Sequence, residues 1–128
     1  VRVPLASGLL TGKMNLNSSF PKNDHRNYNI NGDSFDVGET FSGINFHKGI
    51  EAVKELKTLL PQDFSLTDLA LKWILSHDEV TVVIPGAKNK LQAQLNTRAS
   101  EMNNINTIMN SISDIYQSYF KDDVHSRW

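Results

Sequence analysis

Two segments of the chain combine small residues, a turn and a lysine in a way that suits the binding of an anion. In the first, residues 4–13, a predicted strand ends and is followed by Ala6, Ser7 and Gly8, with Lys13 six residues after Ser7. Small residues let the backbone approach an anion, and exposed N–H groups can point at it. An ordinary strand-to-turn junction with a solvated lysine fits the same residues, so this segment alone leaves both interpretations open.

The second segment, residues 84–96, repeats this layout with a helix after the turn. Gly86 ends a predicted strand, and Asn89 is a suitable N-cap for a helix that runs to about residue 98. A helix N-terminus offers unpaired N–H groups and a partial positive charge, which favour phosphate. The polar side chains available there are Lys88, Lys90, Gln92 and Asn96. The alternative interpretation is a capped helix with solvated lysines.

The composition limits any anion site to a local one. The 128 residues are 39% hydrophobic and 21% charged, with a formal net charge of −1. No overall positive field would attract nucleic acid or an anionic membrane. The chain has no cysteine, which excludes disulfides, thiolate metal sites and cysteine nucleophiles and is compatible with a reducing cytoplasm. No apolar run approaches the roughly 20 residues of a membrane span, so we expect a cytoplasmic protein that binds neither nucleic acid nor membrane.

Hydrophobic periodicity predicts an alternation of strands and helices. The β-branched run 80–84 is typical of a strand buried on both faces of a parallel sheet. Ser65 and Asp68 have the spacing of a capping box. The predicted segments are a strand and phosphate loop at 1–13, a long loop at 14–46, helices at 47–77, a strand, loop and helix at 80–98, and a C-terminal helix at 105–120. We expect the tail, residues 121–128, to be frayed.

This order of elements indicates an α/β fold with two parallel strands that cannot stand alone. Strands separated by helices pair in parallel, and a stable sheet normally needs three or more strands. The first residue, Val1, lies inside a predicted strand, which suggests that the chain is part of a larger sheet or barrel. A large uncovered apolar surface would lead to self-association, to swapping of elements or to disorder between Met14 and Phe46.

Taken together, these motifs resemble the aldo-keto reductase family over nearly the whole chain. Residues 4–13, Pro-Leu-Ala-Ser-Gly-Leu-Leu-Thr-Gly-Lys, are similar to the segment that follows the family's seventh strand. Residues 84–88, Ile-Pro-Gly-Ala-Lys, are similar to the segment after its eighth strand, and residues 69–75 match its Leu-Ala-Leu-X-Trp helix. Phe20-Pro21 and residues 24–26 resemble the long loop that folds over the bound cofactor.

The resemblance implies the C-terminal part of a (β/α)8 TIM barrel. This chain would supply the last two strands, their helices and the C-terminal helix of a protein that reduces small carbonyl substrates by hydride transfer from NADPH. Barrels of this kind often bind phosphate in the loops after strands seven and eight. The resemblance and the reasoning from residue types therefore place an anion in the same two loops.

The resemblance also assigns individual residues to NADP(H). The pyrophosphate would be lined by Pro4, Leu5, Ala6 and Ser7. Lys13 would balance its charge, and Arg26 would contact it from the long loop.

At the second loop, Lys88 and Gln92 would hold the 2′-phosphate, Gly86 would let the backbone approach, and Asn96 would hydrogen-bond the adenine. The family often has Glu before that Asn; this chain has Leu95 instead, so one adenine contact is expected to be lost.

No catalytic residue is predicted in this chain. The family's Tyr, Lys, Asp and His lie on earlier strands, upstream of the segment that Val1 begins, and no residue here occupies a matching position. No pair of histidines has a spacing that suggests zinc. Two other interpretations remain open: a non-catalytic subunit that senses NADPH, and an interaction module that binds a partner through its apolar C-terminal helix.

Overall fold

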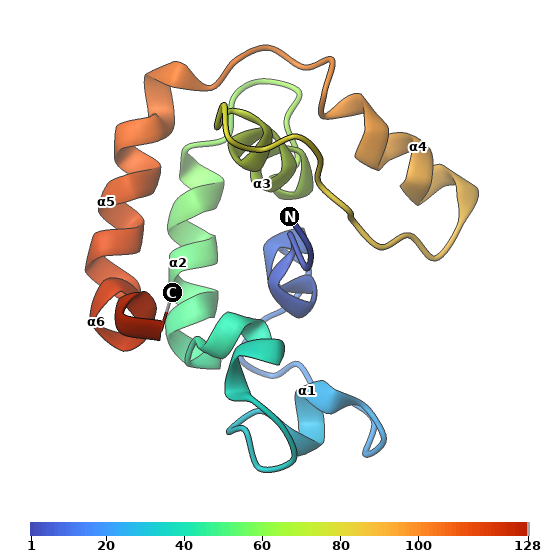
Figure 1. The fold of residues 1–128 in the computed structure, drawn as a ribbon, viewed down its shortest axis with the longest axis vertical. Coiled ribbons are helices and arrows are strands. Elements are labelled where there is room, and N and C mark those ends of the chain that lie inside the picture. The colour runs from blue at the N-terminus through green and yellow to red at the C-terminus, as the bar shows by residue number, and fades with distance from the viewer. Residues whose placement is uncertain (128) are drawn as a thin grey trace.

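The computed structural model describes residues 1–127, and the regular elements in that range are helices joined by irregular segments. Figure 1 shows α2 (Phe46–Thr58) and α5 (Met109–Tyr119) side by side and running in opposite directions, with α3 (Leu66–Leu75) next to them and α4 (Lys90–Arg98) set apart at the edge. The shorter elements are η1 (Ala6–Thr11), α1 (His25–Tyr28), η2 (Val37–Glu39), η3 (Phe41–Gly43), η4 (Asn106–Ile108), α6 (Lys121–Val124) and η5 (His125–Arg127). None of the described helices is long and apolar enough to cross a membrane.

Side-chain caps fix where the long helices begin. The predicted capping box is confirmed: the Ser65 hydroxyl accepts the Asp68 N–H (3.2 Å), and the Asp68 carboxylate accepts the Ser65 N–H (2.9 Å). Asn45 caps α2, and the predicted cap Asn89 accepts the Gln92 N–H (2.9 Å) at the start of α4. These caps satisfy N–H groups that have no partner within their own helix.

The two predicted strands do not form. Residues 1–5 and 80–84 do lie alongside each other in parallel, but they share a single isolated bridge between Arg2 and Ile84. The predicted burial is also wrong, because the exposed fractions of Val1, Val82 and Ile84 are 52%, 56% and 65%. Two parallel segments without further neighbours cannot complete a ladder or cover their side chains. The barrel portion is therefore not confirmed by the described residues.

The hydrophobic core lies where η1, η3, α2 and α3 meet. Its buried members are Ala6, Leu9, Phe41, Phe46, Ile50, Val53, Leu66, Leu69 and Ile105. Phe41 is fully buried, and its ring lies 5.0 Å from that of Phe46. Part of the first segment predicted to bind an anion, residues 4–13, is therefore built into the core.

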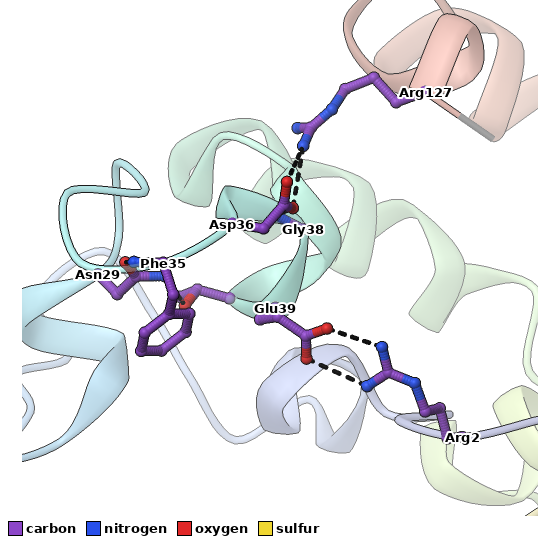
Figure 2. Close-up of polar contacts among 8 residues, drawn as sticks. Arg2, Asn29, Phe35, Asp36, Gly38, Glu39 and Arg127 are labelled. Atoms are coloured by element: carbon purple, nitrogen blue, oxygen red, sulfur yellow. Dashed lines mark hydrogen bonds and ion pairs between the residues drawn. The ribbon is translucent and has the colours of Figure 1, made fainter.

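The long segment 14–46 is organised around a buried amide. The side chain of Asn29 is fully buried and donates to the hydroxyl of Thr40 (3.1 Å). Its carbonyl oxygen accepts the N–H groups of Ser34 and Phe35, at 2.9 Å each. Figure 2 shows Asn29 beside Phe35. This network fixes the shape of a segment that has no long helix. A further hydrogen bond, from the Phe41 N–H to the Ser7 hydroxyl (3.1 Å), connects the segment to η1.

Two ion pairs connect this segment to both ends of the described chain. Figure 2 shows Arg2 making a two-pronged contact with Glu39, and Arg127 contacting Asp36. All four side chains are at least a third exposed, so each pair contributes little to stability. The expectation of a frayed tail is wrong for residues 121–127, which form α6 and η5. Residue 128 lies outside the described residues.

Asn29→Ala should destabilise the protein by about 1–3 kcal/mol, because it removes the three hydrogen bonds of a fully buried amide. Asn31→Ala is the control, since Asn31 is exposed and only two residues away. Urea unfolding followed by circular dichroism measures both variants. Equal midpoints for Asn29→Ala and the wild type would contradict the role given to this amide.

Candidate functional site

The two segments predicted to bind an anion, residues 4–13 and 84–96, face one cleft of about 840 Å³. All of the predicted cofactor residues except Ala6 line it, although the two groups lie some eighty positions apart in sequence. The lining residues among them are Pro4, Leu5, Ser7, Lys13, Arg26, Gly86, Lys88, Gln92 and Asn96. Ala6 is buried in the core and borders an apolar groove between α2, α3 and α5 instead.

The first wall of the cleft is the turn of η1, and its backbone is unusual. Ser7 and Gly8 both have left-handed φ angles, of 55° and 92°. This conformation costs a residue with a side chain about 1–2 kcal/mol, whereas glycine adopts it freely. The hydrogen bond from the Phe41 N–H to the Ser7 hydroxyl helps hold the turn. The sequence of small residues after Pro4 is thus explained by a tight turn at the wall of the cleft.

Arg26 reaches this wall from α1. Its guanidinium donates to the Ser7 carbonyl (3.4 Å) and lies over the ring of Phe20, 4.6 Å from its centroid. Asp24, which also caps α1, accepts two further hydrogen bonds from the same guanidinium. The hydrogen bond from Arg26 lowers the pKa of Asp24 to about 2. The carboxylate therefore stays ionised and paired at neutral pH.

The second wall is the turn before α4 together with the first turns of that helix. The Lys88 N–H donates to the side-chain oxygen of Gln92 (2.7 Å), which leaves the Gln92 amide nitrogen as the available donor. The Asn96 amide donates to the Gly86 carbonyl (3.2 Å) and closes the turn. A Cβ atom added at Gly86 would meet nothing within 4 Å, so the space in front of this backbone is open.

An ion pair between an exposed arginine and a buried carboxylate helps to set the position of the second wall. Arg98, at the end of α4, donates to both carboxylate oxygens of Asp68 (3.3 and 2.8 Å) and to the Asp63 carbonyl (3.1 Å). Burial raises the pKa of Asp68, but the hydrogen bonds from Arg98 and Ser65 outweigh it and hold that pKa below its usual value. The Asp68 side chain is only 4% exposed.

For several residues that line the cleft, nothing in the sequence predicted a place there. Asp68 and Arg98 line it, as do Thr11, Ser65 and Thr67. The capping-box pattern marked Ser65 and Asp68 only as a helix start. Nothing local links Asp68 to an arginine thirty residues away, so sequence reasoning missed the pair.

Charge is distributed unevenly along the cleft. Arg26 is balanced by Asp24, and Arg98 is balanced by Asp68. Lys13 and Lys88 also line the cleft, and among the described residues neither ammonium group takes part in an ion pair. Two uncompensated positive charges on opposite walls suit a ligand that carries several negative charges.

The aromatic and histidine side chains with acid–base potential lie elsewhere. The Tyr116 hydroxyl is 2.9 Å from Nδ1 of His125, and Nδ1 of His25 is 3.1 Å from the Thr40 hydroxyl. None of these side chains lines the cleft. Within residues 1–127 no group of three His, Cys, Asp or Glu side chains could hold a metal ion.

Comparison with known protein families matches residues 1–116 to the model of the Aldo/keto reductase family. The matched range includes both walls of the cleft and every predicted cofactor residue. No curated protein and no solved structure gives a significant match to the chain.

Asp68→Asn should destabilise the protein by about 1.5–3 kcal/mol at neutral pH, the usual contribution of a hydrogen bond to a charged group. Because the folded-state pKa of Asp68 is lowered, its stabilisation is complete above the unfolded-state pKa of about 3.9 and is lost as the pH falls below it. The difference between wild type and variant should therefore shrink on acidification.

Thermal unfolding between pH 3 and pH 7 measures this difference. Asp63→Asn is the matched control. Asp63 is exposed, its hydrogen bond to Arg98 is made by its backbone carbonyl, and its carboxylate acts on Arg98 only through its charge, as the smallest of the influences on the Arg98 pKa. Its left-handed φ of 67° is one that asparagine tolerates. A pH-independent difference for Asp68→Asn, or one no larger than that of Asp63→Asn, would contradict the assignment.

Proposed function

We propose, since this chain belongs to the aldo/keto reductase family, that it forms the phosphate- and adenine-binding part of an NADPH-dependent carbonyl reductase. Membership indicates an oxidoreductase function, and the family generally uses NAD(P)H. The observation that carries the proposal is the gathering of the two phosphate segments around one cleft with two uncompensated lysines.

The cleft suits a dinucleotide in size and chemistry. Its volume of about 840 Å³ lies within the usual range for small-molecule pockets. The open space in front of Gly86 permits close approach to the backbone. When bound, the cofactor supplies the hydride; the residues of this chain bind and orient it.

The first wall would hold the pyrophosphate. Lys13 has a positive charge that is not paired with a carboxylate among the described residues. Arg26 offers N–H donors, although its charge is already balanced by Asp24. Pro4, Leu5 and Ser7 give the wall its shape. The predicted contact of Ala6 with the pyrophosphate is revised. Ala6 is buried, so it shapes the turn and does not touch the ligand directly.

The second wall would hold the 2′-phosphate and the adenine. Lys88 brings charge, and Gln92 brings an amide nitrogen, because its oxygen is already used by the Lys88 N–H. The Asn96 side-chain amide donates a hydrogen bond to the Gly86 carbonyl, so in this structure it stabilises the turn. Leu95 also lines the cleft and is 43% exposed, which offers an apolar surface to a base.

Lys88→Ala should weaken NADPH binding about tenfold to hundredfold and leave NADH binding nearly unchanged. The reason is that a charge-assisted hydrogen bond contributes about 1.5–3 kcal/mol, and only NADPH carries the 2′-phosphate. Gln92→Ala should act in the same direction but more weakly, because it removes no charge.

Fluorescence titration of both cofactors measures these affinities. Lys90→Ala is the matched control, since Lys90 is exposed two residues further on and does not line the cleft. Equal losses for NADPH and NADH, or equal effects of Lys88→Ala and Lys90→Ala, would show that Lys88 is only a solvated charge.

The 128-residue chain alone should not catalyse carbonyl reduction, because no side chain with acid–base potential sits at a position that matches the family's proton donor, and binding energy does not replace such a donor. An assay with NADPH and 4-nitrobenzaldehyde, run beside an intact aldo-keto reductase, measures this. Turnover comparable to that of the intact enzyme would overturn the prediction.

A further inference from the structure

The arginine of the first wall is already bound to an anion of the protein itself. Nε of Arg26 donates to one carboxylate oxygen of Asp24 (2.9 Å), and Nη2 donates to the other (2.6 Å). Both side chains are partly buried, with exposed fractions of 26% and 20%. This two-pronged geometry is the one that guanidinium groups form with carboxylates and phosphates alike.

The rest of the guanidinium is directed at the cleft wall. Nη1 donates to the Ser7 carbonyl (3.4 Å), and the group is stacked over Phe20. Arg26 lines the cleft, so a phosphate bound there would meet an arginine whose two best-aligned donors are occupied by Asp24. It would also meet the negative charge of that carboxylate.

We infer that Asp24 acts as an internal competitor of the bound phosphate: it occupies the donors of Arg26 and weakens the affinity of the cleft for anions. This inference rests on the proposed function, because it takes the ligand of the first wall to be a pyrophosphate group. Asp24 also caps α1 through the Arg26 N–H (2.9 Å) and so fixes where Arg26 lies. It is therefore both a positioning residue and a limit on affinity.

The two roles can be separated by substitution. Asparagine caps helices as well as aspartate does, and its side-chain oxygen can still accept from Arg26, so Asp24→Asn keeps the position and removes the charge. Asp24→Ser is a second neutral cap. Both variants should bind inorganic pyrophosphate about threefold to tenfold more tightly than the wild type at low ionic strength, where charge effects are least screened.

Isothermal titration calorimetry of the full 128-residue chain with inorganic pyrophosphate tests this, with circular dichroism to establish that each variant is folded. Asp36→Asn is the matched control, because Asp36 is likewise a helix cap paired with an arginine, Arg127 (Figure 2), but is more exposed than Asp24 and does not line the cleft. Arg26→Gln should weaken binding.

Tighter binding by either folded neutral variant, with Asp36→Asn unchanged, supports the inference. Affinity equal to the wild type, or weaker, in the folded neutral variants overturns it and leaves the proposed function intact. A wild-type chain that does not bind pyrophosphate overturns both.

Discussion

The ion pair between Asp68 and Arg98 is the contact on which the second wall of the cleft depends. The helix α4 has no buried residue of its own, so hydrophobic packing contributes little to its position. Arg98 connects its last turn to the buried carboxylate at the start of α3, and the buried Ala99 follows directly. This ion pair at the end of α4, together with the parallel pairing of residues 1–5 with 80–84 before it, brings Lys88 and Gln92 opposite the first wall.

Paired and unpaired basic side chains contribute differently to this cleft. The balanced pairs, Arg26 with Asp24 and Arg98 with Asp68, hold backbone elements in place and add little net charge. Lys13 and Lys88 supply the field that a ligand would meet. This division explains how a chain with a net charge of −1 can present a local site for an anion.

Local signals in the sequence predicted local structure well. The capping box at Ser65 and the cap at Asn89 set helix starts through contacts three residues apart. The predicted cofactor residues followed from a family resemblance, and the structure places all of them except Ala6 around one cleft. Contacts between distant residues were not predictable: nothing in the sequence pointed Arg98 at Asp68, and the β-branched run 80–84 indicated a strand that two segments alone cannot sustain.

The central claim is that two loops far apart in sequence form one phosphate-binding cleft. An NMR titration of the isotopically labelled chain with NADPH tests it most directly. The account predicts that backbone amides of residues 7–13 and of residues 86–92 shift together, with one common dissociation constant. Shifts confined to one of the two loops, or two unrelated dissociation constants, would contradict it.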